Sequence, residues 1–208
     1  MKLLVLGGTG GTGRQVVAQA LEAGHDVTVF ARNPSGAAIP HQRLRIVEGD
    51  VRAPAALGEA MRGQDAVISA IGRGKSFKSE HLIAQSVPGI IAAMRENGVT
   101  RLIFTSALGV GETYRDCPLF QKVFIRTLLR GIYADKIIGD QMIRDSRLDW
   151  TIVQPAALTD GPLTRTYRVG EHLPLSGIAS VSRADTAHFI IDRINDRSTF
   201  GRTLIVAN

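Results

Sequence analysis

The chain has one cysteine in 208 residues and no apolar run long enough to cross a membrane, and each shortage excludes a class of protein. Cys117 cannot form an internal disulfide, and it lacks the cysteine and histidine neighbours of a metal site. This agrees with a reducing compartment and with no bound metal. The opening MKLLVL ends at Gly7, which is too short for a signal peptide. We therefore expect a cytoplasmic protein without membrane contact.

Blocks of like charge are also missing. The formal net charge of +6 is spread along the chain, so we expect no nucleic-acid partner, and an anionic small ligand would explain the excess equally well. A hydrophobic content of 44% with 21% charged residues is typical of globular proteins. Residues 1–208 are expected to form one domain, because this length does not require a second core.

Short apolar runs of strand length alternate with helical patterns along the chain. The runs show little polar alternation, as expected of strands covered on both faces, and lie at 2–6, 26–30, 44–48, 65–70, 101–106, 149–154 and 203–207. Helical patterns lie at 13–23, at 79–97 with Pro88 implying a kink or a later start, at 118–146 in two segments divided near Gly131, and at 183–194. This alternation predicts an α/β protein, a doubly wound Rossmann fold with a mainly parallel sheet and helices on both faces.

Glycine is concentrated in GGTGGTG, directly after the first expected strand and before the first helix. The spacing Gly7-x-x-Gly10-x-x-Gly13 differs from G-x-G-x-x-G, and by itself it could be a plain tight turn. At a junction between strand and helix, glycines let backbone N–H groups and the positive end of the helix dipole approach a pyrophosphate. The position therefore favours a nucleotide-binding loop.

No aspartate or glutamate occurs between Val27 and Val47, where NAD-binding proteins usually carry a carboxylate that accepts from the ribose 2′-OH. Instead, the second strand runs into Arg32 and Asn33, followed by Pro34-Ser35. A guanidinium and small polar groups there could hold a 2′-phosphate, or Arg32 could be a solvated loop residue. The pattern favours NADP over NAD.

Two further strand ends carry residues suited to a nucleotide. Asp50, after the third strand, could accept a hydrogen bond from the adenine amino group or simply cap a turn. After the fourth strand, Ile71 and Gly72 leave room for a ribose. The following Arg73 and Lys75 could meet phosphate or form an ordinary basic loop.

Several stretches together resemble the atypical short-chain dehydrogenases/reductases, and most of all their flavin reductase/biliverdin-IXβ reductase branch and their NmrA-like and NAD(P)H-binding relatives. These stretches are GGTGGTG, VTVFARNPS, VEGDV, QDAVISAIG, IIAAMRENGVTRLIFTSALGVG, GDQMIRDSRLDWTIVQPA and SVSRADTAHFII. The resemblance covers nearly the whole chain. It implies the fold and a dinucleotide cofactor, but not one substrate, because the group includes reductases, epimerase-like enzymes and redox sensors.

The resemblance also implies roles for residues at the ends of the strands. Arg32 is expected at the 2′-phosphate, and Ser106, after the fifth strand, is expected to face the nicotinamide unless it only bonds the backbone. The complete set expected to bind the cofactor is Gly7, Thr9, Gly10, Gly11, Thr12, Gly13, Arg32, Asn33, Asp50, Val51, Ala70, Ile71, Gly72, Ser106, Lys136 and Pro155.

The chain departs from the family pattern at the catalytic residues. Related enzymes use Tyr-x-x-x-Lys, in which the lysine lowers the pKa of the tyrosine, but here Tyr133 precedes Lys136 by one residue too few. Lys136 matches the lysine that many atypical members keep near the nicotinamide ribose, or else forms a surface pair with Asp140. The predicted catalytic set is Ser106, Lys136 and Tyr133. Ala157 stands where the biliverdin-reducing branch has a histidine, which argues against biliverdin.

The simplest activity for this pattern is direct hydride transfer from NADPH to a flavin (FMN or FAD bound as substrate), a quinone or a similar small acceptor. The acceptor is expected to lie against segments at about 107–117 and 157–177. An NADP-binding regulator without turnover and an epimerase- or dehydratase-like enzyme remain alternatives. We expect a monomer or a homodimer.

Overall fold

A single large sheet organises the molecule. The computed structural model describes residues 1–33, 36, 40–72 and 81–208, and these form an eight-stranded sheet in the order β3-β2-β1-β4-β5-β6-β10-β8. Its pairings are parallel except that of β8 with β10. The strands are β1 (Lys2–Leu6), β2 (Asp26–Ala31), β3 (Leu44–Glu48), β4 (Ala66–Ser69), β5 (Arg101–Thr105), β6 (Asp149–Pro155), β8 (Arg168–Gly170) and β10 (Arg202–Ala207). This order confirms the predicted Rossmann fold.

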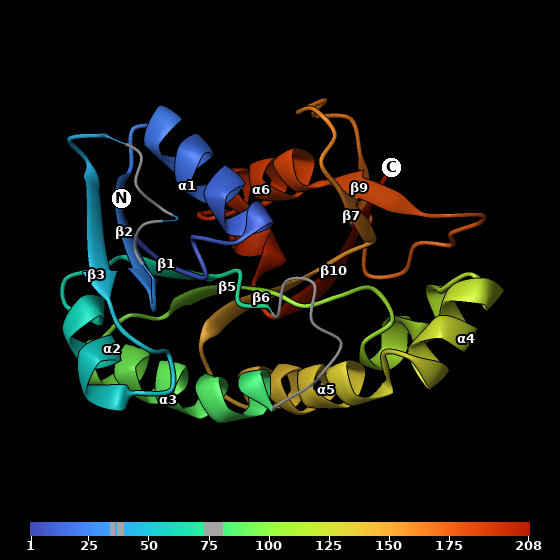
Figure 1. Cartoon of the computed structure of the whole chain (residues 1–208), viewed down its shortest axis with the longest axis horizontal. Coiled ribbons are helices and arrows are strands. Elements are labelled where there is room, and N and C mark those ends of the chain that lie inside the picture. Colours follow the sequence, from blue (N-terminus) through green and yellow to red (C-terminus); the bar gives the residue numbers. More distant parts are fainter. Residues whose placement is uncertain (34–35, 37–39, 73–80) are drawn as a thin grey trace.

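Helices cover both faces of the sheet (Figure 1). One face carries α1 (Gly11–Glu22) beside α6 (Arg183–Asp192), and the other carries α2 (Pro54–Met61), α3 (Leu82–Glu96) and α5 (Arg130–Arg144). At one end of the molecule lie α4 (Leu119–Thr127) and a small parallel sheet of β7 (Ala157–Thr159) and β9 (Ser180–Ser182). The short 3₁₀ helices are η2 (Gly111–Asp116) and η3 (Arg197–Thr199). Within the described ranges, no helix is both long enough and apolar enough to cross a bilayer.

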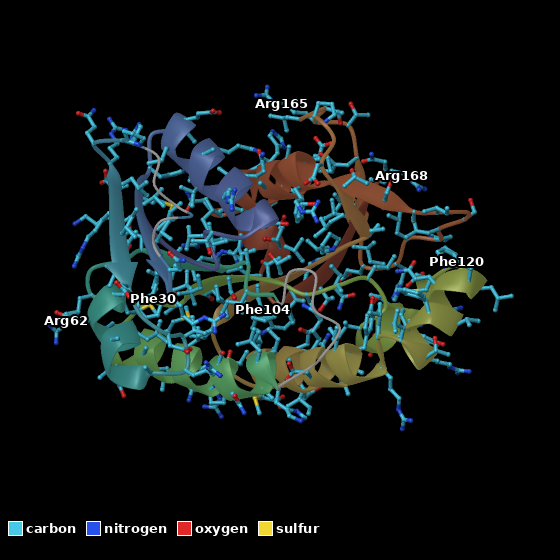
Figure 2. All side chains as sticks on the ribbon, viewed as in Figure 1. Phe30, Arg62, Phe104, Phe120, Arg165 and Arg168 are labelled. Carbon is cyan, nitrogen blue, oxygen red and sulfur yellow. The ribbon has the colours of Figure 1, made fainter. Side chains whose placement is uncertain are left out.

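Two apolar layers lie between the sheet and its helices, which explains why most strands lack polar alternation. Leu3 and Val5 of β1 belong to the layer under α1 and α6, whereas Leu4 and Leu6 belong to the layer over α2 and α3. The second layer also holds Phe30 and Phe104, which Figure 2 shows in the interior. Because both faces of a central strand are buried, both of its side-chain rows must be apolar.

β3 is an exception, and the expectation that every strand is covered on both faces is wrong for it. Its side chains are only half-buried or exposed, because β3 is the outermost strand beside β2. The sequence analysis also did not predict α2 or the short strands β7, β8 and β9. The predicted helix 79–97 begins at Leu82 and continues through Pro88. Pro34, Ser35, Arg73 and Lys75 lie outside the described residues.

α5 is fixed against α3 by two contacts that set the position of the residues it carries. Asp135 of α5 caps the N-terminus of α3, since its carboxylate oxygens accept from the N–H groups of Ile83 at 3.0 Å and Ala84 at 2.9 Å. One turn further along, Gly139 lies so close to Ile83 that a Cβ on this glycine would collide with the isoleucine side chain. The spacing of the two helices therefore depends on a glycine at position 139.

Gly139→Ala is expected to lower the free energy of unfolding by about 1–3 kcal/mol, because a methyl group has no room against the buried Ile83. Gly58→Ala in α2 is the matched control: a Cβ there meets nothing within 4 Å, so this variant should gain roughly 0.4–1 kcal/mol. Urea denaturation of both variants measures the difference. Equal stability of the two variants would show that the α3–α5 contact does not constrain the fold.

Candidate functional site

The turn between β1 and α1 is held by contacts that only glycine permits. Gly7 has a φ of +80°, and a Cβ on it would lie 2.6 Å from the carbonyl oxygen of Ala70, after β4. A Cβ on Gly13 would collide with the Gly7 carbonyl, because α1 starts directly over the turn. The Gly10 N–H closes the turn by donating to the Gly7 carbonyl at 3.0 Å. Gly7 and Gly13 are therefore required by the backbone itself.

The N-terminus of α1 presents unused backbone donors. Gly10 precedes the helix in an extended conformation, no side chain among the described residues caps it, and the first turn has no acidic residue. The first-turn N–H groups, from Gly11 to Gly13, have no acceptor inside the helix. Together with the positive end of the helix dipole, they suit an anion such as a phosphate. Gly11 itself makes room for Arg183, whose Nε would lie 2.7 Å from an added Cβ.

A cleft of about 360 Å³ lies at the carboxyl ends of β1, β2, β3 and β4. It brings together much of the predicted cofactor set: Gly7, Thr9, Gly10, Arg32, Asn33, Val51, Ala70, Ile71 and Gly72. The glycine turn and the Arg32-Asn33 pair thus border one continuous space. Gly11, Thr12, Gly13 and Asp50 do not line it.

Asp50 is engaged by its own neighbour. Its Oδ2 accepts from Nη2 of Arg52 at 2.6 Å, and its Oδ1 accepts from the Arg52 backbone N–H at 2.9 Å. These hydrogen bonds, with a smaller contribution from the charge of Arg32, lower the pKa of Asp50 to about 2. Val51, rather than Asp50, faces the cleft. An adenine contact of Asp50 would therefore compete with Arg52, and it stays a prediction.

A second cavity, of about 580 Å³, opens at the carboxyl ends of β5 and β6. Ser106, Lys136 and Pro155 line it, so the structure groups these three away from the glycine turn. Its walls are mainly apolar and include Phe120, Phe124, Leu158 and Ile178. Since β4 and β5 are parallel neighbours, the cleft and this cavity open at the same edge of the sheet.

Only parts of the two expected acceptor segments reach the second cavity. Ala107 and Leu108 line it from the first segment, and Ala157 and Leu158 line it from the second. Most of the second segment lies elsewhere, and residues 168–170 form β8 at the edge of the large sheet. The outer wall comes from α4, whose Phe120 and Phe124 line the cavity; the sequence had already suggested Phe120 as a wall residue. Figure 2 shows Phe120 of α4 at the far end of the molecule.

Tyr133 has the opposite of the environment that an acid–base tyrosine needs. Its hydroxyl donates to the carbonyl oxygen of Leu108 at 2.9 Å. Burial, reinforced by Cys117, raises its pKa to about 12, and Lys136 is not among the groups that shift it. Tyr133 also lines the second cavity beside Ser106 and Lys136, but its bonded hydroxyl and raised pKa favour a structural role in joining α5 to the loop after β5, and its catalytic role stays a prediction.

The chain matches a family model described as NAD(P)H-binding over residues 7–197. The chain belongs to this NAD(P)H-binding family. This confirms the predicted resemblance. A solved structure described as a Rossmann-fold NAD(P)-binding family protein from Shigella flexneri is 30% identical, with a TM-score of 0.75 over 99% of this chain and 92% of that one.

Two relatives whose names state a function have different functions: one is an assembly factor and the other is a reductase. The photosystem II assembly factor Ycf39 of Synechocystis sp. is 27% identical over 98% of this chain and 61% of that protein. The (4-alkanoyl-5-oxo-2,5-dihydrofuran-3-yl)methyl phosphate reductase of Streptomyces griseus is 28% identical over 78% of this chain and 50% of that protein. The chain thus spans between half and two thirds of the length of these two relatives.

The residues of the cleft fit the dinucleotide that the NAD(P)H-binding family takes. The uncapped first turn of α1 offers N–H donors to a pyrophosphate. On the β4 side, a Cβ on Gly72 would meet no atom of the described residues within 4 Å. Ile71 and Val51 supply apolar contacts on the lining. Family membership and local geometry therefore point to the same space.

A buried polar network behind the second cavity was not anticipated from the sequence. Gln154 of β6 donates through Nε2 to the Val110 carbonyl at 3.0 Å and to Oδ2 of Asp140 at 3.3 Å, and its Oε1 accepts from the Thr113 hydroxyl. Asp140 is 0% exposed, and it closes no ion pair with Lys136 in the described structure. The alternative of a surface pair between these two residues is therefore wrong.

Gly10→Ala should separate cofactor binding from folding in this NAD(P)H-binding protein. An added Cβ would lie 3.4 Å from the Gly7 carbonyl, which the fold tolerates, but it would stand in the cleft at the start of α1. We expect an unchanged melting temperature and an affinity for NADPH reduced by roughly tenfold or more, about 1.4 kcal/mol. Calorimetric titration measures it, and undiminished affinity would place the dinucleotide elsewhere.

Proposed function

We propose that this protein is an NADPH-dependent reductase that passes a hydride to a flavin, a quinone or a similar small acceptor. The proposal rests on one observation: an apolar cavity carrying Ser106 and Lys136 opens beside the dinucleotide cleft at one edge of the sheet. NADPH, when bound, supplies the hydride. The contribution of the chain is to hold the acceptor beside the cofactor and to keep water away.

The preference for NADPH over NADH rests on Arg32. Its exposed guanidinium lies at the carboxyl end of β2 and lines the cleft next to Asn33. No carboxylate stands between Val27 and Val47 to accept from a ribose 2′-OH or to repel a 2′-phosphate. A planar guanidinium can bind such a phosphate through two parallel hydrogen bonds.

Arg32→Ala should weaken NADPH binding by about 10- to 100-fold and leave NADH binding nearly unchanged, because hydrogen bonds to a charged group are worth about 1.5–3 kcal/mol. Arg62→Ala is the matched control, since Arg62 is an exposed arginine that does not line the cleft and lies at the margin of the molecule in Figure 2. Dissociation constants for both nucleotides measure the effect. Equal affinity of the unmutated protein for the two would contradict the role of Arg32.

The walls of the second cavity suit a flat, aromatic acceptor. Phe120 and Phe124 of α4 lie on its outer side, and Leu158 and Ile178 contribute further apolar surface. Aromatic and aliphatic walls of this kind bind ring systems by stacking and by the burial of apolar area. Ser106 supplies a hydroxyl at the end of β5. FMN or FAD would enter this cavity as a substrate.

Steady-state oxidation of NADPH and NADH with FMN, a quinone and a dye tests the activity directly. We expect loss of NADPH absorbance only when an acceptor is present, and slower loss with NADH. Tight NADPH binding without oxidation by any acceptor would instead favour a non-enzymatic role, and the similarity to an assembly factor makes that outcome the informative alternative.

A further inference from the structure

Two buried oxygen atoms of the second cavity's rear wall lack hydrogen-bond partners. These are Oγ of Ser106 and Oδ1 of Asp140, and neither has a partner within the described part of the chain. Buried polar atoms are nearly always bonded, so each unpaired one requires an explanation. Asp140 is 0% exposed and Ser106 only 6%, so water outside the molecule does not satisfy them. The pair lies where β5 ends against α5.

The Ser106 hydroxyl faces Asp140 without closing a hydrogen bond in this structure, and it acts on the titration of that carboxyl. Burial raises the pKa of Asp140, and Lys136, Ser106, Arg144 and Gln154 lower it by smaller amounts. The charged groups among these, Lys136 and Arg144, both lie on α5. The other two groups are neutral: Ser106 directly follows β5, and Gln154 lies in β6.

We propose that Asp140 is a buried proton donor that returns a proton to the Ser106 hydroxyl when the acceptor is reduced. The inference rests on the proposed reductase function. In this proposal, Asp140 passes its proton to Ser106 and does not itself contact the acceptor. Ser106 lines the cavity, whereas Asp140 lies behind it.

Reduction of a quinone needs both a hydride and a proton. The hydride that NADPH supplies brings two electrons to the quinone and leaves negative charge on its oxygen. Ser106 gives its hydroxyl proton to that oxygen and takes the proton of Asp140. Asp140 is left as a carboxylate, which Lys136 favours by lowering the pKa of Asp140, until a proton from water restores the acid; burial lowers the pKa of Lys136 itself, and Asp140 and Asp135 oppose that shift.

A purely structural role explains the arrangement less well. Gln154 satisfies only Oδ2 of Asp140, and Gln154 already donates to the Val110 carbonyl, so it could do without the aspartate. An ionised carboxylate kept for stability would be expected to pair with Lys136, one turn earlier on α5, but the two close no ion pair in the described structure. A neutral acid with one free oxygen toward Ser106 agrees with both facts.

The kinetic test compares a quinone with N-methylphenazinium, a cationic dye that accepts a hydride without needing a proton. Asp140→Asn keeps the shape and the Gln154 contact but cannot give up a proton. We expect the ratio of quinone to dye turnover to fall on the order of 10²-fold or more. Ser106→Ala should give a similar fall, and the double variant should lose little more than either alone, because the two act in series.

The pH profile distinguishes proton donation from support of the fold. Asp140 donates only while protonated, so quinone turnover by the unmutated protein should fall as pH rises through its raised pKa, above the ordinary value of about 3.9. This fall should be absent in Asp140→Asn. Asp145→Asn is the matched control: Asp145 is exposed at the end of the same helix and its carboxylate accepts from Gln141, so the profile should be retained.

A measurement without turnover completes the test. An infrared difference spectrum between the unmutated protein and Asp140→Asn, with NADPH bound at neutral pH, should contain the carbonyl band of one protonated carboxyl. An ionised Asp140, or an unchanged quinone-to-dye ratio in the variant, would overturn the proposal. Failure of the unmutated protein to reduce either acceptor despite binding NADPH is a different result: it refutes the reductase function and the proton role with it.

Discussion

The functional edge of this protein depends on how closely the turn after β1 approaches the end of β4. Gly7 lies against the Ala70 carbonyl, and Gly13 lies over Gly7, so three backbone segments meet where any side chain would separate them. That contact sets the start of α1 and the wall of the dinucleotide cleft together. The next strand along the sheet, β5, then carries Ser106 to the neighbouring cavity.

α5 sets the position of the residues that line the second cavity, just as the glycine turn sets the wall of the cleft. Asp135 anchors the helix by capping α3, and Gly139 lets it approach closely. Between these two anchors, Lys136 is directed to the cavity, and Asp140 follows one turn later in the interior. The positions of these side chains therefore follow from a helix–helix contact outside the cavity.

The sheet and the cleft could be predicted because their causes are local. Apolar runs mark strands buried on both faces, and the glycines mark the turn between β1 and α1. The burial of β3 was predicted wrongly because an edge strand can have the same composition as a central strand. β7, β8 and β9 are three residues each, which is too short for a recognisable pattern of apolar residues. The burial of Asp140 and the placement of α4 depend on tertiary packing, which spacing in the sequence does not reveal: Lys136 and Asp140 look like a surface pair until α5 is packed.

The dinucleotide cleft therefore tolerates fewer substitutions during evolution than the second cavity does. At Gly7 and Gly13 of the glycine turn, a single added carbon atom meets backbone, and backbone cannot move aside. Along α4, by contrast, Phe120 is 58% exposed and Phe124 is 44% exposed, so side chains there can change size without disturbing a core. Substitutions along α4 would therefore change the shape of the second cavity long before they changed the nucleotide cleft, so one cleft can be kept beside cavities of diverging shape.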